Sequence, residues 1–410
     1  MKKAVAVILT LLMVFSLFAC TQTTENTPSG SPSQSPTPTP TPSASQPAQS
    51  PAGGGEDAET PPSADTVTDV SALENTIGFF SSGVEPASRD TYEIVWAYMR
   101  PMALFQNITT ALKELEPQLN FTTTEYCANS DIDAMIQTIE IYSDQGVDGF
   151  MIVVDPTASA RIKEVLDGTG IPYVAMLNSV RDETGSEIVP CVGIEGEIAG
   201  AETIQWLYDN YKTYWGDIDE SEIGLLDFNF SPNVDFDDRH NGSKARFLEL
   251  LPGNESKVFS ADGVSGALDE QTGYDLASAI LAANPDVKYW FVAGCIELYS
   301  QGAARAVETL NMDDRVLITA VGSDVLPAEW DGGYDGSWVS CLALSNYQYT
   351  IPGICALVAQ MDGKATPETL WQSRRAPGDQ VTFYNVSYGL LTRDNYKEFF
   401  EQVLVDSGLA

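Results

Sequence analysis

From Tyr92 onward the chain alternates short apolar runs with stretches of helical apolar spacing, and this alternation constrains the fold more than any other feature. The runs at 150–154, 173–177, 289–292 and 316–321 are almost entirely apolar, which is typical of parallel strands covered on both faces. Alternating strands and helices predict an α/β fold, and so many strands favour two doubly wound parallel sheets over one. One helical stripe consists of Leu104, Phe105, Ile108, Ala111, Leu112 and Leu115.

The first 20 residues have the composition of an export signal. A basic start at Lys2 and Lys3 precedes an apolar stretch that ends before Cys20 and is too short for a membrane span. Leu-Phe-Ala-Cys at 17–20 resembles the lipobox at which bacterial prolipoproteins are lipidated and cleaved. The resemblance implies a lipid on Cys20 and a location on the outer face of the cytoplasmic membrane. An uncleaved anchor and ordinary secretion are the alternatives, and each also places the rest of the chain outside the cytoplasm.

Residues 21–65 differ in composition from the rest of the chain. They hold ten prolines, no aromatic residue and no Lys or Arg, so they cannot bury enough apolar surface to fold. We expect a disordered, extended linker that holds the folded part away from the anchor. Residues 66–90 are expected to be transitional between this linker and the folded part.

Charge and histidine content exclude several classes of function. The formal net charge of -37 repels phosphate and argues against nucleic-acid binding. The single histidine, His240, leaves little room for His-based metal sites or for Ser-His catalysis. The carboxylates at 217–222 lack the pattern of a calcium loop, and no Gly-rich phosphate loop follows a strand. We therefore expect no enzyme, no cofactor and no metal.

Five cysteines follow Cys20, an odd number for an exported protein. The interpretation that we favour is that they are small buried apolar residues. A bridge between Cys341 and Cys355 is the alternative, and a monomer then keeps at least one free thiol.

Several short motifs follow one another in an order typical of one known family. Gln-Gly-Val-Asp-Gly at 145–149 leads into the apolar run at 150–154, and Gly-Ile-Pro at 170–172 opens the next run. Further motifs are Asn129-Ser130-Asp131, Asp155-Pro156, Arg239 before Gly242, Asn-Pro-Asp-Val at 284–287, Val-Gly-Ser-Asp at 321–324, and Leu-Thr-Arg-Asp-Asn at 391–395, where Thr392 is placed to cap the last helix. This series, over 92–405, resembles the ribose- and galactose-type periplasmic binding proteins of the type I fold. The lactose-repressor family shares that fold, but an export signal stands here in place of its DNA-binding helix-turn-helix.

The resemblance implies two lobes, joined by three crossovers, that close on a small ligand without chemistry. One lobe would hold 91–193 with 346–370, and the other 194–345 with 371–405. The implied role is that of a monomer that captures a small sugar and delivers it to an ABC permease driven by a separate ATPase. A sensory protein that presents a sugar, a furanose signal or a nucleoside to a membrane receptor is the alternative. A cell-wall-attached adhesive protein is a third class, suggested only by the linker.

Open parallel sheets bind ligands beyond the carboxyl ends of their strands, so candidate site residues follow the strands. The resemblance implies aromatic stacking on a sugar at Tyr98 and Phe105, with packing between strand and helix as the alternative. Asn178 stands where the family often has Asp. Ser179 stands where ribose binders have Arg, and this departure argues for a sugar or polar solute other than ribose.

The remaining candidates come from the opposite lobe. Arg239 matches the family's ligand-binding Arg, with a surface ion pair to Asp237 or Asp238 as the alternative. Asp324 matches the family's hydroxyl-accepting Asp, with a helix cap as the alternative. Glu297 follows a strand where the family often has an Asn-Asp pair, and is a further polar candidate.

The crossover before the late helix supplies the last polar candidates. Ser345 and Asn346 stand where a Gln or Asn of the family commonly contacts the sugar. Trp330 and Phe230 are further stacking candidates, with a place in the core or at the rim as the alternative. The sequence leaves the identity of the ligand open, because aromatic rings stack on a nucleobase as well as on a sugar.

Overall fold

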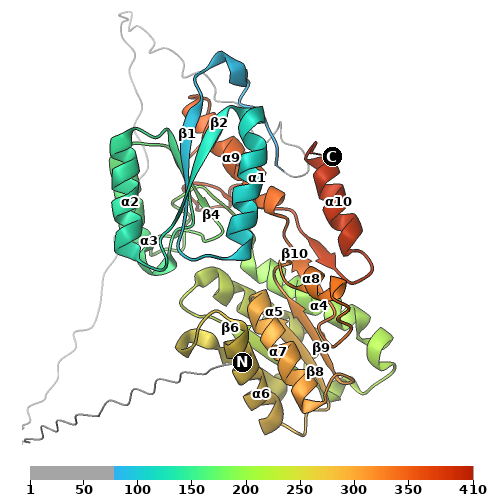
Figure 1. Ribbon diagram of the computed structural model, residues 1–410. Coiled ribbons are helices and arrows are strands. Elements are labelled where there is room, and N and C mark those ends of the chain that lie inside the picture. Colours follow the sequence, from blue (N-terminus) through green and yellow to red (C-terminus); the bar gives the residue numbers. More distant parts are fainter. Residues whose placement is uncertain (1–77, 410) are drawn as a thin grey trace, which may run out of the picture. The chain divides into compact units, whose positions relative to one another are not determined.

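The computed structural model describes residues 78–409, and all of them belong to one compact unit that spans 62–410 (Figure 1). The predicted export signal with Cys20, the predicted linker 21–65 and the first part of the segment 66–90 lie outside the described residues. Within 78–409, none of the helices has the length and apolar character that a membrane crossing requires.

Six parallel strands form the first sheet, in the order β11-β5-β4-β3-β1-β2. Helices α1 and α9 cover one face of this sheet, and α2 and α3 cover the other (Figure 1). These elements are called the first lobe. Their bounds are β1 (Tyr92–Tyr98), α1 (Ala103–Leu119), β2 (Phe121–Cys127), α2 (Ile132–Gln145), β3 (Gly149–Ile152), α3 (Ser159–Thr169), β4 (Tyr173–Met176), β5 (Cys191–Gly193), α9 (Asn346–Met361) and β11 (Phe383–Asn385).

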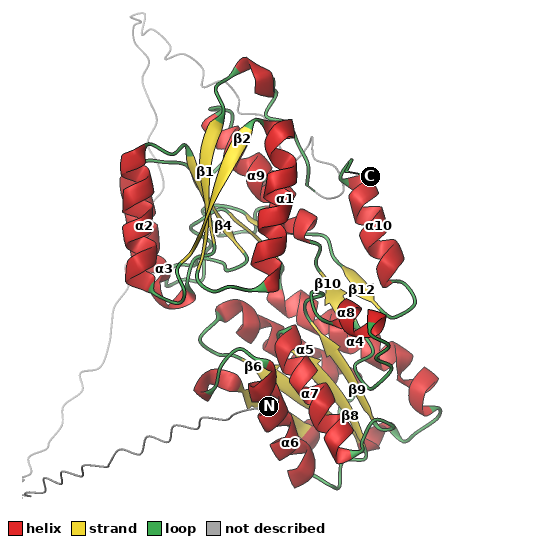
Figure 2. Ribbon diagram, viewed as in Figure 1, coloured by secondary structure: helices red, strands yellow, loops and turns green. Residues whose placement is uncertain are grey.

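Four parallel strands form the second sheet, in the order β7-β6-β8-β9, and bridges at Ile318–Trp338 and Val321–Leu342 attach the antiparallel pair β10-β12 to it. Helices α4 and α5 cover one face, and α6 and α7 cover the other (Figure 2). These elements are called the second lobe. Their bounds are α4 (Gly196–Trp215), β6 (Ile223–Asn229), α5 (Val234–Leu250), β7 (Val258–Asp262), α6 (Glu270–Ala283), β8 (Tyr289–Gly294), α7 (Glu297–Leu310), β9 (Val316–Ala320), α8 (Leu326–Asp331), β10 (Cys341–Ala343), β12 (Gly389–Leu391) and α10 (Tyr396–Asp406).

The prediction of two doubly wound parallel sheets is confirmed. The apolar runs at 150–154, 173–177, 289–292 and 316–321 coincide with β3, β4, β8 and β9, and every residue of β3 and β9 is buried. Both faces of each sheet carry helices, so a strand with no polar face is what such a sheet requires. The predicted stripe on α1 is buried except at Leu104, which is partly buried.

Three crossovers join the lobes, between β5 and α4, between β10 and α9, and between β11 and β12. The third differs from the expected division of the chain. We assigned 371–405 to the second lobe, but Phe383, Tyr384 and Asn385 pair in parallel with β5 of the first sheet. A strand of three residues gives no periodicity in the sequence, so this return to the first lobe escaped detection.

The described part of the segment 66–90 packs on the first lobe. Phe80 is buried in the core beside α9, and Arg89 forms an ion pair of 2.9 Å with Asp362 at the end of α9. The hydroxyl of Tyr92 donates to the same carboxylate at 2.9 Å. Residues 78–90 are therefore part of the folded lobe rather than a transition.

Near the end of the chain, the structure differs from the helix cap that the sequence predicted. We expected Thr392 to cap the last helix, but α10 begins at Tyr396 and the hydroxyl of Thr392 accepts from the backbone N–H of Asp394 at 3.3 Å. Asn395 instead accepts from the backbone N–H of Thr392 at 2.7 Å. The Thr-Arg-Asp-Asn sequence thus closes a turn before the helix, as Ser, Thr and Asn side chains often do.

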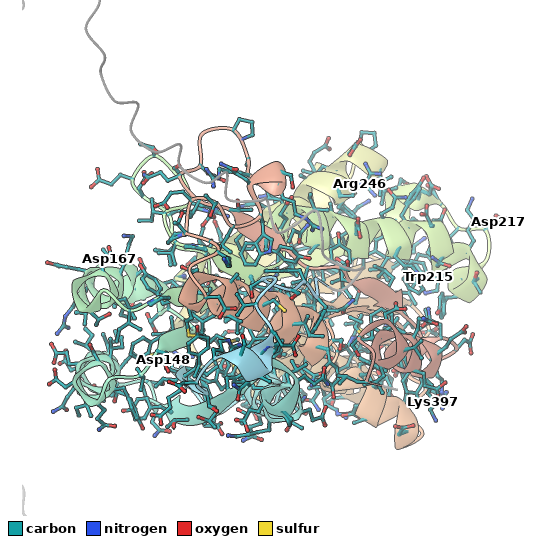
Figure 3. All side chains as sticks on the ribbon, turned by 90° about the horizontal axis from the view of Figure 1, so that it is seen from above. Asp148, Asp167, Trp215, Asp217, Arg246 and Lys397 are labelled. Atoms are coloured by element: carbon teal, nitrogen blue, oxygen red, sulfur yellow. The ribbon has the colours of Figure 1, made fainter. Side chains whose placement is uncertain are left out.

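Many charged side chains lie on the outside of both lobes. Figure 3 labels several charged residues, of which Asp167, Asp217 and Lys397 lie toward the outside of that view and are exposed. Asp217 belongs to the carboxylate-rich segment 217–222, in line with the solvated turn that the sequence suggested. The large acidic excess is thus tolerable, because water screens charges at such positions.

Candidate functional site

Segments that follow strands of the two lobes meet at two places. The first, called the buried interlobe contact, joins Ser179, Arg181 and Glu187 of the first lobe to Asp235 and Asp238 of α5. The second, called the exposed interlobe contact, joins Asn107 of α1 to Asp324, which follows β9. Both lie where chain leaves the carboxyl ends of parallel strands, the edge at which such sheets bind ligands.

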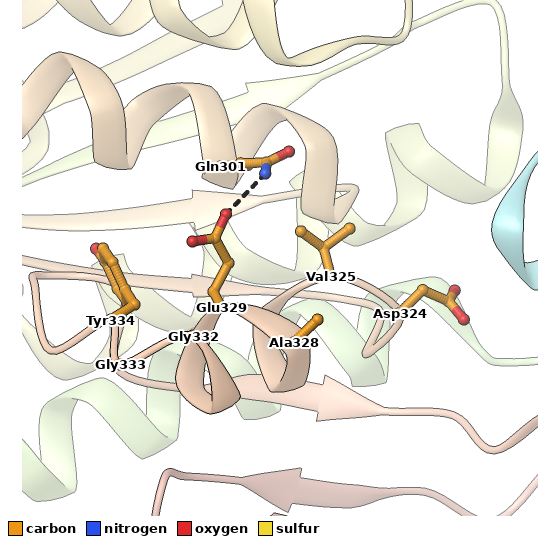
Figure 4. Close-up of a pocket in the computed structure, with 8 residues that line it drawn as sticks. All are labelled: Gln301, Asp324, Val325, Ala328, Glu329, Gly332, Gly333 and Tyr334. Atoms are coloured by element: carbon orange, nitrogen blue, oxygen red, sulfur yellow. Dashed lines mark hydrogen bonds between the residues drawn. The ribbon is translucent and has the colours of Figure 1, made fainter.

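Asp324 is exposed, and its carboxylate faces the first lobe. Its Oδ1 accepts from the Nδ2 of Asn107 at 3.0 Å. Figure 4 shows the carboxylate pointing away from Glu329 and Gln301. Protein on several sides removes water and raises the pKa of Asp324, while the Asn107 hydrogen bond lowers it. A carboxylate that keeps its solvent-facing oxygens can accept further hydrogen bonds.

Glu297 lies beneath Asp324 and holds the segment that follows β9. Its buried carboxylate accepts from the backbone N–H groups of Asp324 at 2.6 Å and of Val325 and Leu326 at 3.1 Å. The start of α8 is thus capped by Glu297, and the expected alternative for Asp324, a helix cap, does not occur. Burial and the charge of Asp324 raise the pKa of Glu297 to about 8. Glu297 therefore holds in place the backbone segment that carries Asp324.

Gly322 makes the close approach of Glu297 possible. Its φ of +124° is one that L side chains rarely adopt, and a Cβ there would lie 2.8 Å from the Glu297 Cγ. The Val-Gly-Ser-Asp motif at 321–324 therefore has a local explanation. The glycine lets a buried carboxylate reach the backbone that presents Asp324.

Arg239 is 9% exposed and lies on α5 of the second lobe. Its Nη1 donates to the carbonyl of Cys295 at 2.8 Å, and its guanidinium lies 5.0 Å from the ring centre of Phe236. The Nε is buried and has no hydrogen-bond partner among the described residues. Instead of Arg239, Arg181 pairs with Asp238, so the expected surface ion pair of Arg239 with that residue is not formed.

Two glycines place the helix that carries Arg239. A Cβ at Gly200 of α4 would lie 1.9 Å from the carbonyl oxygen of Arg239, and a Cβ at Gly242 would lie 1.9 Å from that of Glu197. Helices α4 and α5 therefore pack backbone to backbone, which only glycine permits. In the motif of Arg239 and Gly242, Arg239 is thus the candidate for ligand binding, and Gly242 allows the close packing that positions the helix of Arg239.

Tyr98 and Phe105 pack on each other in the first lobe. Their ring centres are 4.9 Å apart, and Trp96 lies 5.5 Å from Tyr98. The hydroxyl of Tyr98 donates to Glu125. Only 3% of Tyr98, at the end of β1, and 7% of Phe105, in the first turn of α1, is exposed, so both belong to the core of that lobe, which agrees with the packing alternative.

Asn178 and Ser179 follow β4 and contact the second lobe. Asn178 Oδ1 accepts from the Nδ2 of Asn233 at 3.2 Å. Ser179 donates its N–H at 3.2 Å and its hydroxyl at 3.1 Å to Asp235. The turn before them is strained, because Leu177 has a φ of +70°, rare for a residue other than glycine. Where ribose binders have Arg, this chain thus has a Ser that contacts the other lobe.

Ser345 and Asn346 lie at the second crossover. Ser345 caps α9 in a capping box with Gln348, which satisfies backbone groups at the start of the helix. Asn346 donates its Nδ2 to the carbonyl of Asn107 at 3.0 Å. Trp330 packs in the core against Tyr396 at 5.2 Å, in line with the alternative that the sequence left open for it.

Sequence reasoning missed Asn107, Asp235 and Arg181, all of which join the lobes. Asn107 lies on the polar face of an amphipathic helix and Arg181 lies in a polar loop, and neither position carries a motif. Asp235 follows the N-cap Asn233 by two residues, a position where acidic residues are common, so its sequence context indicated no more than a helix start.

A groove of about 580 Å³ lies on the second lobe beside Asp324 (Figure 4). Gln301 and Arg305 donate to Glu329 there, at 3.0 and 2.5 Å. The groove is lined by Gln301, Asp324, Val325, Ala328, Glu329, Gly332, Gly333 and Tyr334.

Among the described residues, no disulfide joins Cys341 to Cys355. Cys341 is a free thiol buried in β10, and Cys191 and Cys295 are free and buried as well. The alternative of a Cys341–Cys355 bridge is therefore excluded in this structure. Burial raises the pKa of the Cys191, Cys295 and Cys341 thiols, which keeps them protonated.

Comparison with known proteins identifies the family. A family model described as the periplasmic binding protein domain matches residues 98–365. The protein belongs to this family. Among curated relatives, the ABC transporter L-arabinose-binding periplasmic protein of Azospirillum brasilense is 24% identical over 280 residues, which cover 66% of this chain and 80% of that protein.

Solved structures of sugar-transport binding proteins share the fold. A periplasmic solute-binding protein from Actinobacillus succinogenes with bound D-allose is 14% identical, with a TM-score of 0.58, and covers 75% of this chain and all of its own length. A 5-methylthioribose transporter binding protein from Thermotoga lettingae is 18% identical, also with a TM-score of 0.58, and covers 78% of this chain and 94% of its own. At these identities the likeness shows the type I periplasmic binding protein fold.

Proposed function

We propose that the protein captures a small sugar between its two lobes outside the cytoplasm and delivers it to an ABC importer. The supporting relatives are an L-arabinose-binding protein, a solute-binding protein with bound D-allose and a 5-methylthioribose transporter binding protein. Asp324, Arg239 and Asn178, with the partly buried Asn346, supply carboxylate, guanidinium and amide groups that suit the hydroxyls of a neutral sugar. Tyr98 and Phe105 are the aromatic candidates for stacking, although the core of the first lobe leaves only 3% and 7% of them exposed.

The unpartnered Nε of Arg239 carries this proposal. A buried donor without a partner costs about 1–3 kcal/mol, and a ligand acceptor that reaches it would remove that cost. Arg239 lies in the second lobe, and its Nη1 is already bound to the carbonyl of Cys295. A hydroxyl or ring oxygen of a sugar is an acceptor of the required kind.

A thermal-shift panel tests the proposal. The chain without its first 20 residues is melted with L-arabinose, D-allose, D-arabinose, myo-inositol, D-glucose, nucleosides and amino acids. A ligand that binds only the folded state at a hundred times its Kd raises the Tm by roughly 5 °C. We expect one sugar to do so. A cooperative melt that no sugar moves would contradict sugar binding.

Arg239→Lys is the matching variant, because lysine keeps the charge but lacks the planar fork. We expect it to abolish the shift caused by the sugar. Arg246→Lys on the same helix is the control, since Arg246 points outward to Gln205 and Glu249. A normal shift in Arg239→Lys would remove this arginine from the site.

The proposal includes a lipid on Cys20 that holds the protein at the outer face of the cytoplasmic membrane. Leu-Phe-Ala-Cys at 17–20 supports it. Cells grown with labelled palmitate should label the wild-type protein, and Cys20→Ser should remove the label and release the protein from the membrane. A labelled Cys20→Ser protein would contradict this assignment.

A further inference from the structure

Asn107 joins three parts of the molecule that are far apart in sequence. It lies on α1 of the first lobe, and its Nδ2 donates to the Asp324 Oδ1 of the second lobe at 3.0 Å. Its backbone carbonyl accepts from the Nδ2 of Asn346, at the second crossover, at 3.0 Å. A single residue thus contacts the first lobe, the crossover and the carboxylate to which we assign a ligand hydroxyl.

The contact fixes the direction of that carboxylate. Glu297 holds the backbone N–H of Asp324, but this leaves the side chain of Asp324 free to rotate. An amide that donates to a charged carboxylate makes a stronger hydrogen bond than a neutral pair does, and here it selects one rotamer. A carboxylate has about four acceptor positions. Asn107 occupies one of them and leaves the others open to ligand hydroxyls.

We propose that Asn107 is a positioning residue that orients Asp324 toward the ligand and does so only when the lobes approach each other. This inference rests on the proposed function. Because donor and acceptor lie on different lobes, separation of the lobes breaks the hydrogen bond and frees the carboxylate. Ligand affinity is thereby coupled to closure through one side chain.

The electrostatics of Asp324 agree with this role. The charge of Asp324 raises the pKa of three neighbours, Glu297 of α7, Cys341 of β10 and Tyr349 of α9. Among the described residues, only Asn107 donates a side-chain hydrogen bond to the Asp324 carboxylate. Loss of water raises the pKa of Asp324, and the Asn107 amide opposes this shift. An ionised carboxylate accepts a hydroxyl more strongly than a protonated one.

The position of Asn107 allows a clean test. Its side chain is exposed and fills no core volume, so Asn107→Leu should leave the fold intact. Gln106→Leu is the matched control, because Gln106 is the exposed neighbour on the same helix and its side chain forms no hydrogen bond with the described residues. Both variants add the same apolar side chain to the same surface.

The first measurement needs no ligand. The pKa of the Asp324 carboxyl is measured by NMR titration in the chain without its first 20 residues. We expect Asn107→Leu to raise this pKa and Gln106→Leu to leave it unchanged. An unchanged pKa in Asn107→Leu would overturn the inference while leaving the proposed function standing.

The second measurement follows L-arabinose affinity by calorimetry from pH 4 to pH 8. At pH 7 we expect Asn107→Leu to weaken binding roughly tenfold, and its loss of binding on acidification to begin at a higher pH than in the wild type. A purely structural role would shift the affinity without moving the pH profile, and that result would also overturn the inference. A wild-type protein that binds L-arabinose at no pH, and no other sugar of the panel, would overturn the proposed function and this role with it.

Discussion

The buried and the exposed interlobe contacts join the same two lobes by different means. In the buried contact, Asp235 is 3% and Glu187 is 4% exposed, and each carboxylate accepts from a first-lobe donor, Ser179 for Asp235 and Arg181 for Glu187. In the exposed contact, both Asn107 and Asp324 face solvent. Removal of one partner from a buried pair leaves a desolvated polar group, whereas water replaces the missing partner at the surface. We infer that the first contact serves stability and the second serves binding.

The two contacts also differ in what surrounds them. The buried contact lies where α5 packs on the start of α4, since a Cβ at Gly196 would lie 2.7 Å from the carbonyl oxygen of Asp235. The exposed contact lies at the surface beside a groove on the second lobe. Changes that reach the first contact should therefore alter the free energy of unfolding, and changes at the second should alter ligand affinity.

The largest expected effect comes from Gly242→Ala. The added Cβ would meet the Glu197 carbonyl, so α5 must move away from α4 and carry Asp235 and Asp238 with it. We expect the free energy of unfolding to fall by about 3 kcal/mol or more. Gly168→Ala is the control, because Gly168 is also helical but has no atom within 4 Å of an added Cβ, and it should stabilise slightly. Equal urea midpoints for the two variants would contradict backbone contact between α4 and α5.

Asp235→Ala comes next. It leaves the N–H and hydroxyl of Ser179 without their acceptor at a buried position, so we expect a loss of about 3 kcal/mol in urea unfolding. Asp133→Ala is a close match, since Asp133 holds the same position in the first turn of α2 but is exposed. The control should cost only a few tenths of a kcal/mol through the helix dipole and a surface ion pair. Equal losses would mean that burial of Asp235 adds nothing.

The free energy of unfolding should also depend on pH. Burial raises the pKa of Glu187 to about 7 and that of Glu297 to about 8. Between pH 5 and 8 the folded state thus holds protons that the unfolded chain has released. The free energy of unfolding should therefore fall as the pH rises through this window, by up to about 1.4 kcal/mol per pH unit for each group.

Glu187→Gln isolates the contribution of the buried interlobe contact to this pH dependence. We expect it to flatten the decline of the unfolding free energy between pH 5 and 7, because the amide does not titrate. Glu183→Gln, at an exposed position of the same loop, should reproduce the wild-type curve. A decline that is unchanged in Glu187→Gln would show that this carboxyl keeps its ordinary pKa.

The smallest expected effect on stability comes from Asp324→Ala, which should alter the free energy of unfolding by less than about 0.5 kcal/mol. The same variant should abolish ligand binding in the thermal-shift panel, because it removes the hydroxyl acceptor and no core volume. Normal binding by Asp324→Ala would place the ligand elsewhere. A large loss of stability would erase the distinction between the two contacts.

Much of the fold was predictable because a strand that is covered by helices on both faces must consist mainly of apolar residues. Strands such as β3 and β9 consist of apolar residues throughout, and α1 repeats them at helical spacing. The strand β11 has only three residues and follows a long loop, so its return to the first sheet left no such mark. The Thr392 cap was wrong because Asn395 competes for the same turn.

The candidate site was predictable only where a residue follows a strand within a motif. Asp324 contacts Asn107 of the first lobe, the hydrogen bond of Arg239 stays within the second lobe, and the contact of both residues with a ligand stays a prediction. The sequence could not show that Glu297 binds backbone N–H groups or that Ser179 contacts Asp235. Such pairs are separated by 27 and 56 positions, and no local preference connects them.

By itself, the sequence determined the alternation of strands and helices, the parallel sheets and the acidic surface, because these depend on which residues avoid water. Only the tertiary structure decided which side chains meet across the lobes. Asn107, Asp235 and Arg181 look like ordinary polar surface residues until the crossovers bring the two lobes together. The physical reason is that burial is a property of each residue, whereas a hydrogen bond between lobes is a property of how two rigid bodies are joined.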